Sequence, residues 1–133
     1  MLAYEIKTVL SQLESRLGQH AISIRCNCAN LEVVYVSLDE GGQVCVSDDH
    51  RTFQYLDGSN DSTYVAVGQI DLAAVAAACT HHGVALIPAG EDGFPRIEYK
   101  PRTDEPIADA IGKVASAVDA VFQIAIHPSV RIL

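Results

Sequence analysis

The sequence predicts an α+β domain in which an antiparallel sheet of about five strands is covered by helices, in the order α-β-β-β-α-β-β-α. Apolar residues recur every three or four positions in the helical segments and every second position in most of the strand segments. The links between successive strands have the length of hairpin turns, which join antiparallel but not parallel strands. With 133 residues, the chain is expected to form one domain over residues 1–133.

The first part of the chain is predicted to form one helix and three strands. The helix is expected over residues 2–17, where apolar residues follow a helical stripe, and Gly18 is expected to end it. The strands are expected at residues 22–24, 31–38 and 44–46, which alternate in polarity or are rich in β-branched and aromatic residues. The sequence Asp-Glu-Gly-Gly between the second and third strands is typical of a hairpin loop.

The middle of the chain is predicted to contain a loop and a second helix. Residues 51–56 fit either a short strand or a single helical turn, and both alternatives stay open. Residues 57–62 combine aspartate, glycine, serine and asparagine, which favour turns, so a loop is expected there. Asp71 is expected to cap a helix that ends at Gly83.

The last part is predicted to form two strands, at residues 84–87 and 96–100, and a long helix. Thr103 or Asp104 is expected to cap this helix and Pro128 to end it. Its predicted core stripe consists of Ile107, Ile111, Val114, Val118, Val121, Phe122 and Ala125. Small residues on the same helix would allow another helix to approach, which suggests self-association through Ala108, Ala110, Ala115, Ala117, Ala120 and Ala125.

The chain is strongly acidic, with 17 acidic and 9 basic residues, a formal net charge of −8 and a pI near 4.9. A phosphate backbone would be repelled, so no nucleic-acid partner is expected. No segment is long and apolar enough to cross a bilayer and the N-terminus lacks an export signal, so we expect a cytoplasmic protein without a membrane partner. The four cysteines are expected to be thiols in that compartment.

Acidic residues concentrate between Glu32 and Asp71, where Arg51 is the single basic residue. Such a segment can simply be a solvated surface that keeps the protein soluble. It can also bind a basic protein in competition with nucleic acid, or dock a basic helix. For this second interpretation, the predicted partner-binding residues are Asp39, Glu40, Asp48, Asp49, Asp57 and Asp61.

The tripeptide Asp48-Asp49-His50 brings two carboxylates and an imidazole together in the sequence, which could bind a divalent metal or supply an acid and a base. Adjacent residues of a strand point to opposite faces, however, and in a turn aspartate side chains bond nearby backbone amides. The turn is therefore the favoured interpretation. The pair Cys26-x-Cys28 is spaced too closely for a structural zinc site, and neither Gly-x-Ser-x-Gly nor a phosphate-binding loop occurs, so no catalytic residue, metal or cofactor is predicted.

Residues 46–52 read Val-Ser-Asp-Asp-His-Arg-Thr, residues 82–84 read His-Gly-Val, and a long alanine-rich helix is predicted from Ile107 to Ile126. In this order, these motifs resemble an uncharacterised family of small phage and mobile-element domains, whose strand-end pattern is Leu/Val-Ser/Thr-Asp-Asp-Gly-x-Thr. His50 stands where the family has glycine, which makes a positive φ less assured, although histidine tolerates it better than branched residues do. The resemblance implies the fold more than an activity.

The leading hypothesis is a non-enzymatic acidic protein-binding module of mobile-element type, which masks or inhibits a protein partner, as an immunity or anti-defence protein would. The size, charge and element order are also similar to class I type III secretion chaperones, which are acidic cytoplasmic homodimers that hold an extended effector segment. That resemblance implies a homodimer. A third hypothesis is a metal-dependent enzyme centred on Asp48, Asp49 and His50.

Overall fold

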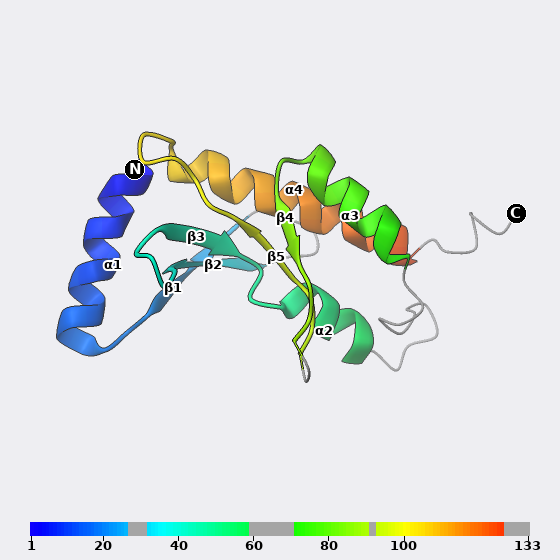
Figure 1. The fold of residues 1–133 in the computed structure, drawn as a ribbon, viewed down its shortest axis with the longest axis horizontal. Helices are drawn as coiled ribbons and strands as arrows, with labels where there is room; N and C mark the ends of the chain where they lie inside the picture. The colour runs from blue at the N-terminus through cyan, green and yellow to red at the C-terminus, as the bar shows by residue number, and fades with distance from the viewer. Residues whose placement is uncertain (27–31, 59–70, 91–92, 127–133) are drawn as a thin grey trace, which may run out of the picture.

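The computed structural model of the protein describes residues 1–26, 32–58, 71–90 and 93–126. Within these residues the chain forms four helices and an open antiparallel sheet of five strands, which confirms the predicted α+β class (Figure 1). The strands lie in the order β1-β2-β3-β5-β4. The elements are α1 (Ala3–Leu17), β1 (Ala21–Arg25), β2 (Val33–Leu38), β3 (Val44–Ser47), α2 (Arg51–Gly58), α3 (Leu72–His81), β4 (Ala85–Ile87), β5 (Arg96–Tyr99) and α4 (Ile107–Ile126).

The segment for which the sequence allowed two structures is helical and forms α2, which has eight residues. Its side chains Phe53 and Leu56, three positions apart, are fully buried, while Arg51 and Gln54 are exposed. The helix also takes up the first two residues of the predicted loop. The remaining loop residues, 59–62, lie outside the described part of the chain.

The sheet has one apolar and one polar face. Val46 lies opposite Val36 on one side and Tyr99 on the other, so these three side chains share the face that packs on the helices. Ser47 lies opposite Tyr35 and Glu98, which share the other face. This arrangement follows from the alternation of side chains along each strand, which places every second residue on the same face.

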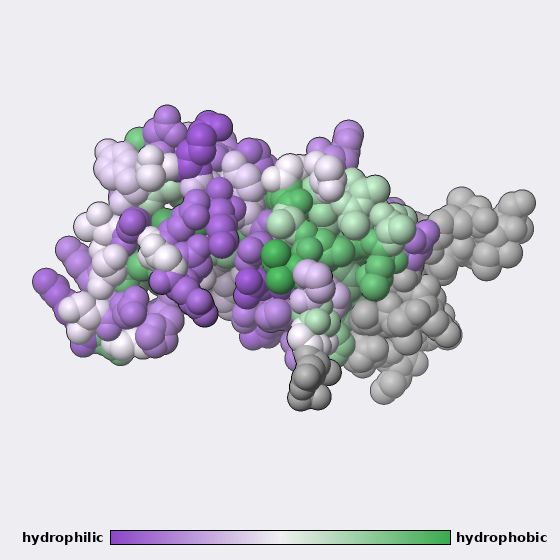
Figure 2. All heavy atoms as spheres, viewed as in Figure 1, coloured by the Kyte–Doolittle hydropathy of each residue, from purple (hydrophilic) through white to green (hydrophobic). Residues whose placement is uncertain are grey.

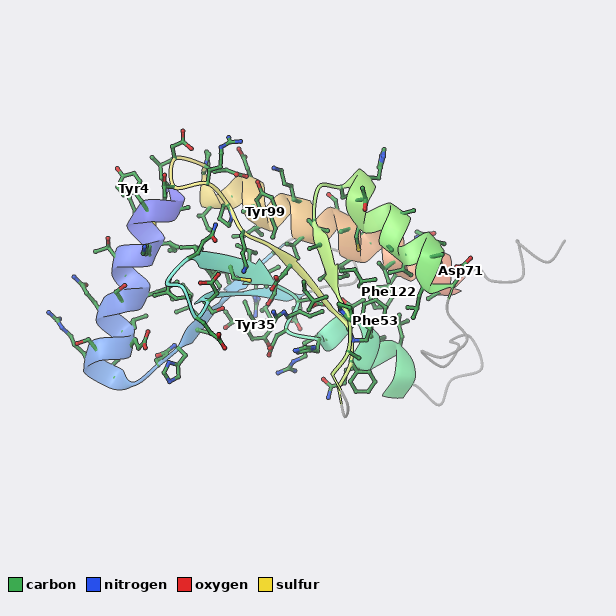
Figure 3. The ribbon with its side chains drawn as sticks, in the orientation of Figure 1. Tyr4, Tyr35, Phe53, Asp71, Tyr99 and Phe122 are labelled. Atoms are coloured by element: carbon green, nitrogen blue, oxygen red, sulfur yellow. The ribbon has the colours of Figure 1, made fainter. Side chains whose placement is uncertain are left out.

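All four helices contribute to the rest of the core. The predicted apolar stripe of α4 is confirmed: Val114, Val118 and Val121 are fully buried, and the remaining stripe residues are buried or partly buried. Phe122 of α4 and Phe53 of α2 lie in the same core cluster, and Figure 3 shows them close to each other. Asp71 caps α3 as predicted, because its Oδ1 accepts the N–H of Ala74 at 3.1 Å.

The predicted cap of the last helix is wrong. Neither Thr103 nor Asp104 caps α4, which begins at Ile107, after Pro106. A residue before proline is disfavoured in helical geometry, so the chain from Thr103 to Glu105 forms a turn instead. The predicted stop at Pro128 lies outside the described residues.

This turn joins the beginnings of the first and last helices. The carbonyls of Glu105 and Thr103 accept the N–H groups of Ala3 and Tyr4 at 2.9 and 3.0 Å, which satisfies donors that the first turn of a helix leaves free. In return, Ile107 N–H donates to the Met1 carbonyl at 2.8 Å. The two helices are thus capped by backbone contacts that short-range sequence patterns do not report.

Among the described helices, none combines the length and the apolar character that a membrane span requires.

Candidate functional site

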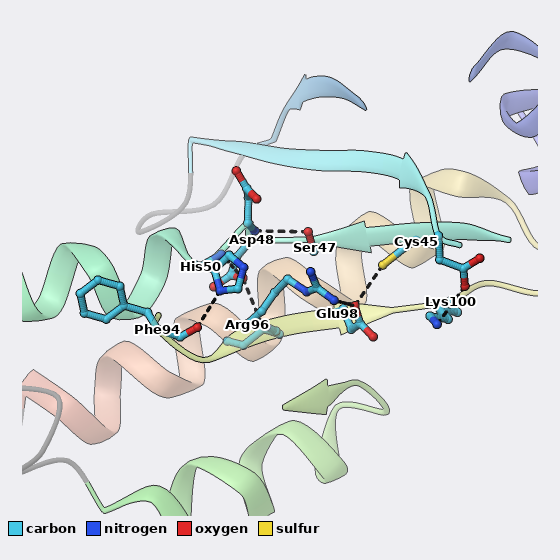
Figure 4. A network of polar contacts seen from close by, with 11 residues as sticks. Cys45, Ser47, Asp48, His50, Phe94, Arg96, Glu98 and Lys100 are labelled. Atoms are coloured by element: carbon cyan, nitrogen blue, oxygen red, sulfur yellow. Dashed lines mark hydrogen bonds and ion pairs between the residues drawn. The ribbon is translucent and has the colours of Figure 1, made fainter. Parts of the chain in front are cut away.

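The polar face of the sheet carries a hollow of about 520 Å³ over β2, β3 and β5. Polar side chains of three neighbouring strands form its base: Tyr35, Ser37, Cys45, Ser47, Arg96 and Glu98. Figure 4 shows Cys45, Ser47, Arg96 and Glu98 projecting from adjacent β3 and β5. We call this space the sheet hollow.

A three-residue network crosses the base of the sheet hollow. Cys45 Sγ donates to Glu98 Oε2 at 3.2 Å, and Arg96 Nη2 donates to the same oxygen at 2.7 Å. Burial, together with the neighbouring Glu98 carboxylate, raises the pKa of the Cys45 thiol to about 12. The thiol is therefore protonated at neutral pH and is a poor nucleophile, because the thiolate is the reactive form.

A second ion pair closes the end of the hollow next to the β2–β3 turn. Lys100 Nζ lies 2.9 Å from Asp39 Oδ2, while Asp39 Oδ1 accepts the N–H of Gln43 at 2.8 Å. The hydrogen bond from Lys100, followed by that from Gln43, lowers the pKa of Asp39. Asp39 thus stabilises the hairpin turn and already has a cationic partner.

Asp48 occupies a different position from the other predicted site residues, because its side chain is 0% exposed. Its Oδ1 accepts the N–H groups of His50 and Ile97 at 3.1 and 3.0 Å, and its Oδ2 accepts that of Thr52 at 3.3 Å. Burial raises the pKa of Asp48, and the hydrogen bonds to its carboxylate oppose the shift. The predicted bonding of this carboxylate to backbone amides is confirmed.

The residues after Asp48 form a tight turn. Asp49 and His50 have φ values of 53° and 65°, and Arg51 N–H donates to the Asp48 carbonyl at 3.0 Å, as in a type I′ turn. His50 therefore adopts the positive φ that glycine would favour in the resembled motif. Its Nδ1 lies 2.6 Å from the carbonyl of Phe94, which ties the turn to the chain leading into β5.

This geometry does not assemble Asp48, Asp49 and His50 into a metal site. The Asp48 carboxylate is buried among backbone amides, Asp49 is exposed, and the His50 ring contacts a carbonyl oxygen. Within the described residues, no group of three or more histidine, cysteine, aspartate or glutamate side chains is arranged to hold a metal ion. The metal-dependent hypothesis has no geometric support in this part of the chain.

The structure separates the six predicted partner-binding residues. Glu40 and Asp49 are exposed and line the sheet hollow, as does the paired Asp39. Asp48 does not belong to this surface, because its side chain is buried. Asp57 lies in α2 but its side chain is not among those described, and Asp61 lies outside the described residues.

Sequence reasoning missed the groups at the base of the hollow. Arg96 and Glu98 of β5 and Lys100 directly after it occupy every second position, as Cys45 and Ser47 do in β3. Charged residues at every second position of a strand indicate one polar sheet face, so this signal was present in the sequence. It did not reveal that β3 and β5 are neighbours.

Comparison of the chain with known protein families, with curated proteins and with solved structures found no match.

Proposed function

We propose that this protein is a non-enzymatic binding module that holds a basic protein partner against the polar face of its sheet. The observation that carries the proposal is the charge distribution of the sheet hollow. Its two cations, Arg96 and Lys100, are each paired with a carboxylate of the hollow, whereas Glu40 and Asp49 are exposed carboxylates without an ion pair among the described residues. A basic partner would complement this excess negative charge.

The state of the reactive groups also favours binding over catalysis. The Cys45 thiol is held protonated by its surroundings, and the Asp48 carboxylate is buried among backbone N–H groups. Neither group is placed to act on a bound molecule as a nucleophile or base. The likeness of residues 46–52 to mobile-element domains supports, as part of the same proposal, a role in masking or inhibiting a target protein.

Affinity capture from a host lysate tests this proposal, with mass spectrometry identifying what co-purifies at about 50 mM and about 500 mM salt. We expect a stoichiometric basic protein that is retained at low salt and reduced at high salt. The double variant Glu40→Gln, Asp49→Asn should retain less of it. A matched control is Glu14→Gln, Asp104→Asn, which removes the same charge from two exposed sites outside the hollow. If neither the double variant nor the control changed the amount of captured protein, the assigned surface would be wrong.

A homodimer of the secretion-chaperone type is a second candidate, favoured by an apolar surface over α3 and β4. Figure 2 shows apolar atoms gathered over these two elements. Leu72 is 46% exposed, and Ala73, Ala77 and Ala85 are also exposed. Among the described strands, β4 pairs only with β5 and so forms an edge of the sheet. We place self-association at this α3–β4 surface.

The alanines of the last helix offer less surface for self-association than the sequence suggested. Ala110, Ala117 and Ala125 are 0% exposed because they pack in the protomer's own core. Ala115 and Ala120 are partly buried, which leaves Ala108 as the exposed member of the set. A second copy cannot reach the buried alanines without opening that core.

A further inference from the structure

We infer that the sheet hollow binds an extended segment of the partner with two basic side chains four residues apart. This inference rests on the proposed function and specifies the kind of segment that the partner presents.

The spacing follows from the positions of the two exposed carboxylates. Glu40 lies in the turn before β3 and Asp49 in the turn after it, so the strand separates them. With a rise of about 3.3 Å per residue, a strand and its flanking residues from 43 to 48 span about 17 Å. Basic residues at positions i and i+4 of an extended segment lie on one face, about 13 Å apart. Their flexible lysine or arginine side chains can span the remaining distance to the two carboxylates.

The base of the hollow offers partners to the backbone of such a segment. Arg96 donates to Glu98 through Nη2, and its side chain is 35% exposed. A guanidinium has five N–H donors, so the exposed part retains donors for a carbonyl oxygen. The hydroxyls of Ser37 and Ser47 line the same space and can donate or accept.

An extended basic segment fits these groups better than other cationic or apolar ligands. A linear polyamine would satisfy Glu40 and Asp49 but would offer no acceptor to Arg96. An amphipathic helix would require an apolar groove, whereas the strands contribute hydroxyl, thiol, guanidinium and carboxylate groups here. A nucleic acid would place phosphates against the four carboxylates Asp39, Glu40, Asp49 and Glu98.

Two blocked synthetic peptides of equal length and charge test the inference, using the full chain labelled with ¹⁵N. Both have a serine, threonine and valine background. One carries two lysines four positions apart, and the other carries them adjacent, so that they point to opposite faces of an extended segment. We expect the first peptide to bind at least threefold more tightly and to shift the amide signals of Ser37, Cys45 and Ser47.

Variants assign the binding to individual groups. Glu40→Gln and Asp49→Asn should each weaken binding of the first peptide about two- to fivefold, as for exposed ion pairs. Asparagine tolerates the positive φ at position 49, so the turn is kept. Arg96→Lys keeps the charge but removes the planar fork of donors, and it should weaken binding with little change in its salt dependence. The charge-matched control Glu14→Gln, Asp104→Asn should bind as the unaltered protein does.

Equal affinity for both peptides, or signal shifts confined to other elements, would overturn the inference. The proposed function fails in a different way. A salt-sensitive basic partner whose capture is unaffected by Glu40→Gln, Asp49→Asn and Arg96→Lys would overturn the hollow as its binding site while leaving a binding module in place. Absence of any basic partner together with absence of peptide binding would reject both.

Discussion

Asp48 and Ile97, 49 positions apart in the chain, form two hydrogen bonds with each other. Asp48 N–H donates to the Ile97 carbonyl at 3.1 Å, and Ile97 N–H donates to the Asp48 side-chain Oδ1 at 3.0 Å. The second bond uses a carboxylate because the Asp48 carbonyl has turned away to accept Arg51 N–H. The side chain thereby extends the pairing of β3 with β5 by one residue beyond the end of β3.

Replacing Asp48 by alanine should therefore destabilise the protein strongly. The change leaves the N–H groups of Ile97, His50 and Thr52 without their acceptor in a buried site. We expect the free energy of unfolding, measured by urea denaturation, to fall by about 3 kcal/mol. Asp48→Asn keeps one carbonyl oxygen and should cost about 1–2 kcal/mol.

Asp49→Asn is the control for that experiment, because Asp49 is exposed and asparagine accepts its positive φ. Its effect should stay within about 0.5 kcal/mol. If Asp48→Ala proved as mild as this control, Asp48 would not be the anchor between β3 and β5.

The Asp48–Ile97 pair illustrates what the sequence could and could not predict. Local patterns placed most of the elements, because Gly18 and Asp71 mark helix ends and the strands alternate in polarity. Eight residues are too few for periodicity to distinguish helix from strand, so the sequence alone leaves both structures open for α2. The α4 start and the sheet hollow depend on contacts between distant segments, which local propensity does not encode.

The stability of the junction between β5 and α4 should depend on pH through Glu105. Its side chain is 5% exposed, and Oε1 accepts from Tyr99 Oη at 2.6 Å, while Lys113 Nζ lies 3.4 Å from Oε2. Burial alone would raise the pKa of Glu105, but the bonds from Tyr99, the Arg102 N–H and Lys113 outweigh it, so the pKa is lowered from 4.5. The ionised carboxylate therefore favours the folded state.

A carboxyl with a lowered folded pKa stabilises the protein above its unfolded pKa, and this contribution is lost as the pH falls through the folded value. We expect Glu105→Gln to reduce the free energy of unfolding by about 2 kcal/mol at neutral pH. The difference from the unaltered protein should shrink as the pH falls below 4.5. Urea denaturation over a series of pH values measures it, and a difference that grew on acidification would contradict the assigned direction.

The buried cysteines Cys45 and Cys79 should be unreactive in the folded protein. Burial raises the pKa of Cys45 to about 12 and that of Cys79 to about 11, so few thiolates form at neutral pH. Among the three cysteines that the structure describes, Cys26 is only partly buried and should react with iodoacetamide before the other two. Peptide mass spectrometry of labelled protein, with a urea-unfolded sample as the reference, measures each site. Rapid labelling of Cys45 in the folded protein would contradict the raised pKa of that thiol.

The α3–β4 surface should carry self-association, since its exposed alanines and Leu72 bear no charge that would oppose a second acidic copy. We expect a concentration-dependent dimer in sedimentation experiments on the unaltered protein. Ala77→Asp places a carboxylate on the exposed side of α3 within this surface. It should shift the chain to monomer while changing the free energy of unfolding by no more than about 1 kcal/mol. Ala108→Asp introduces the same charge on an exposed site of α4 and should leave the dimer intact. A chain that sediments as a monomer at all concentrations would exclude self-association. A dimer that Ala108→Asp dissociates as well as Ala77→Asp does would exclude the α3–β4 surface, because an unpaired charge buried in an interface must weaken that interface selectively.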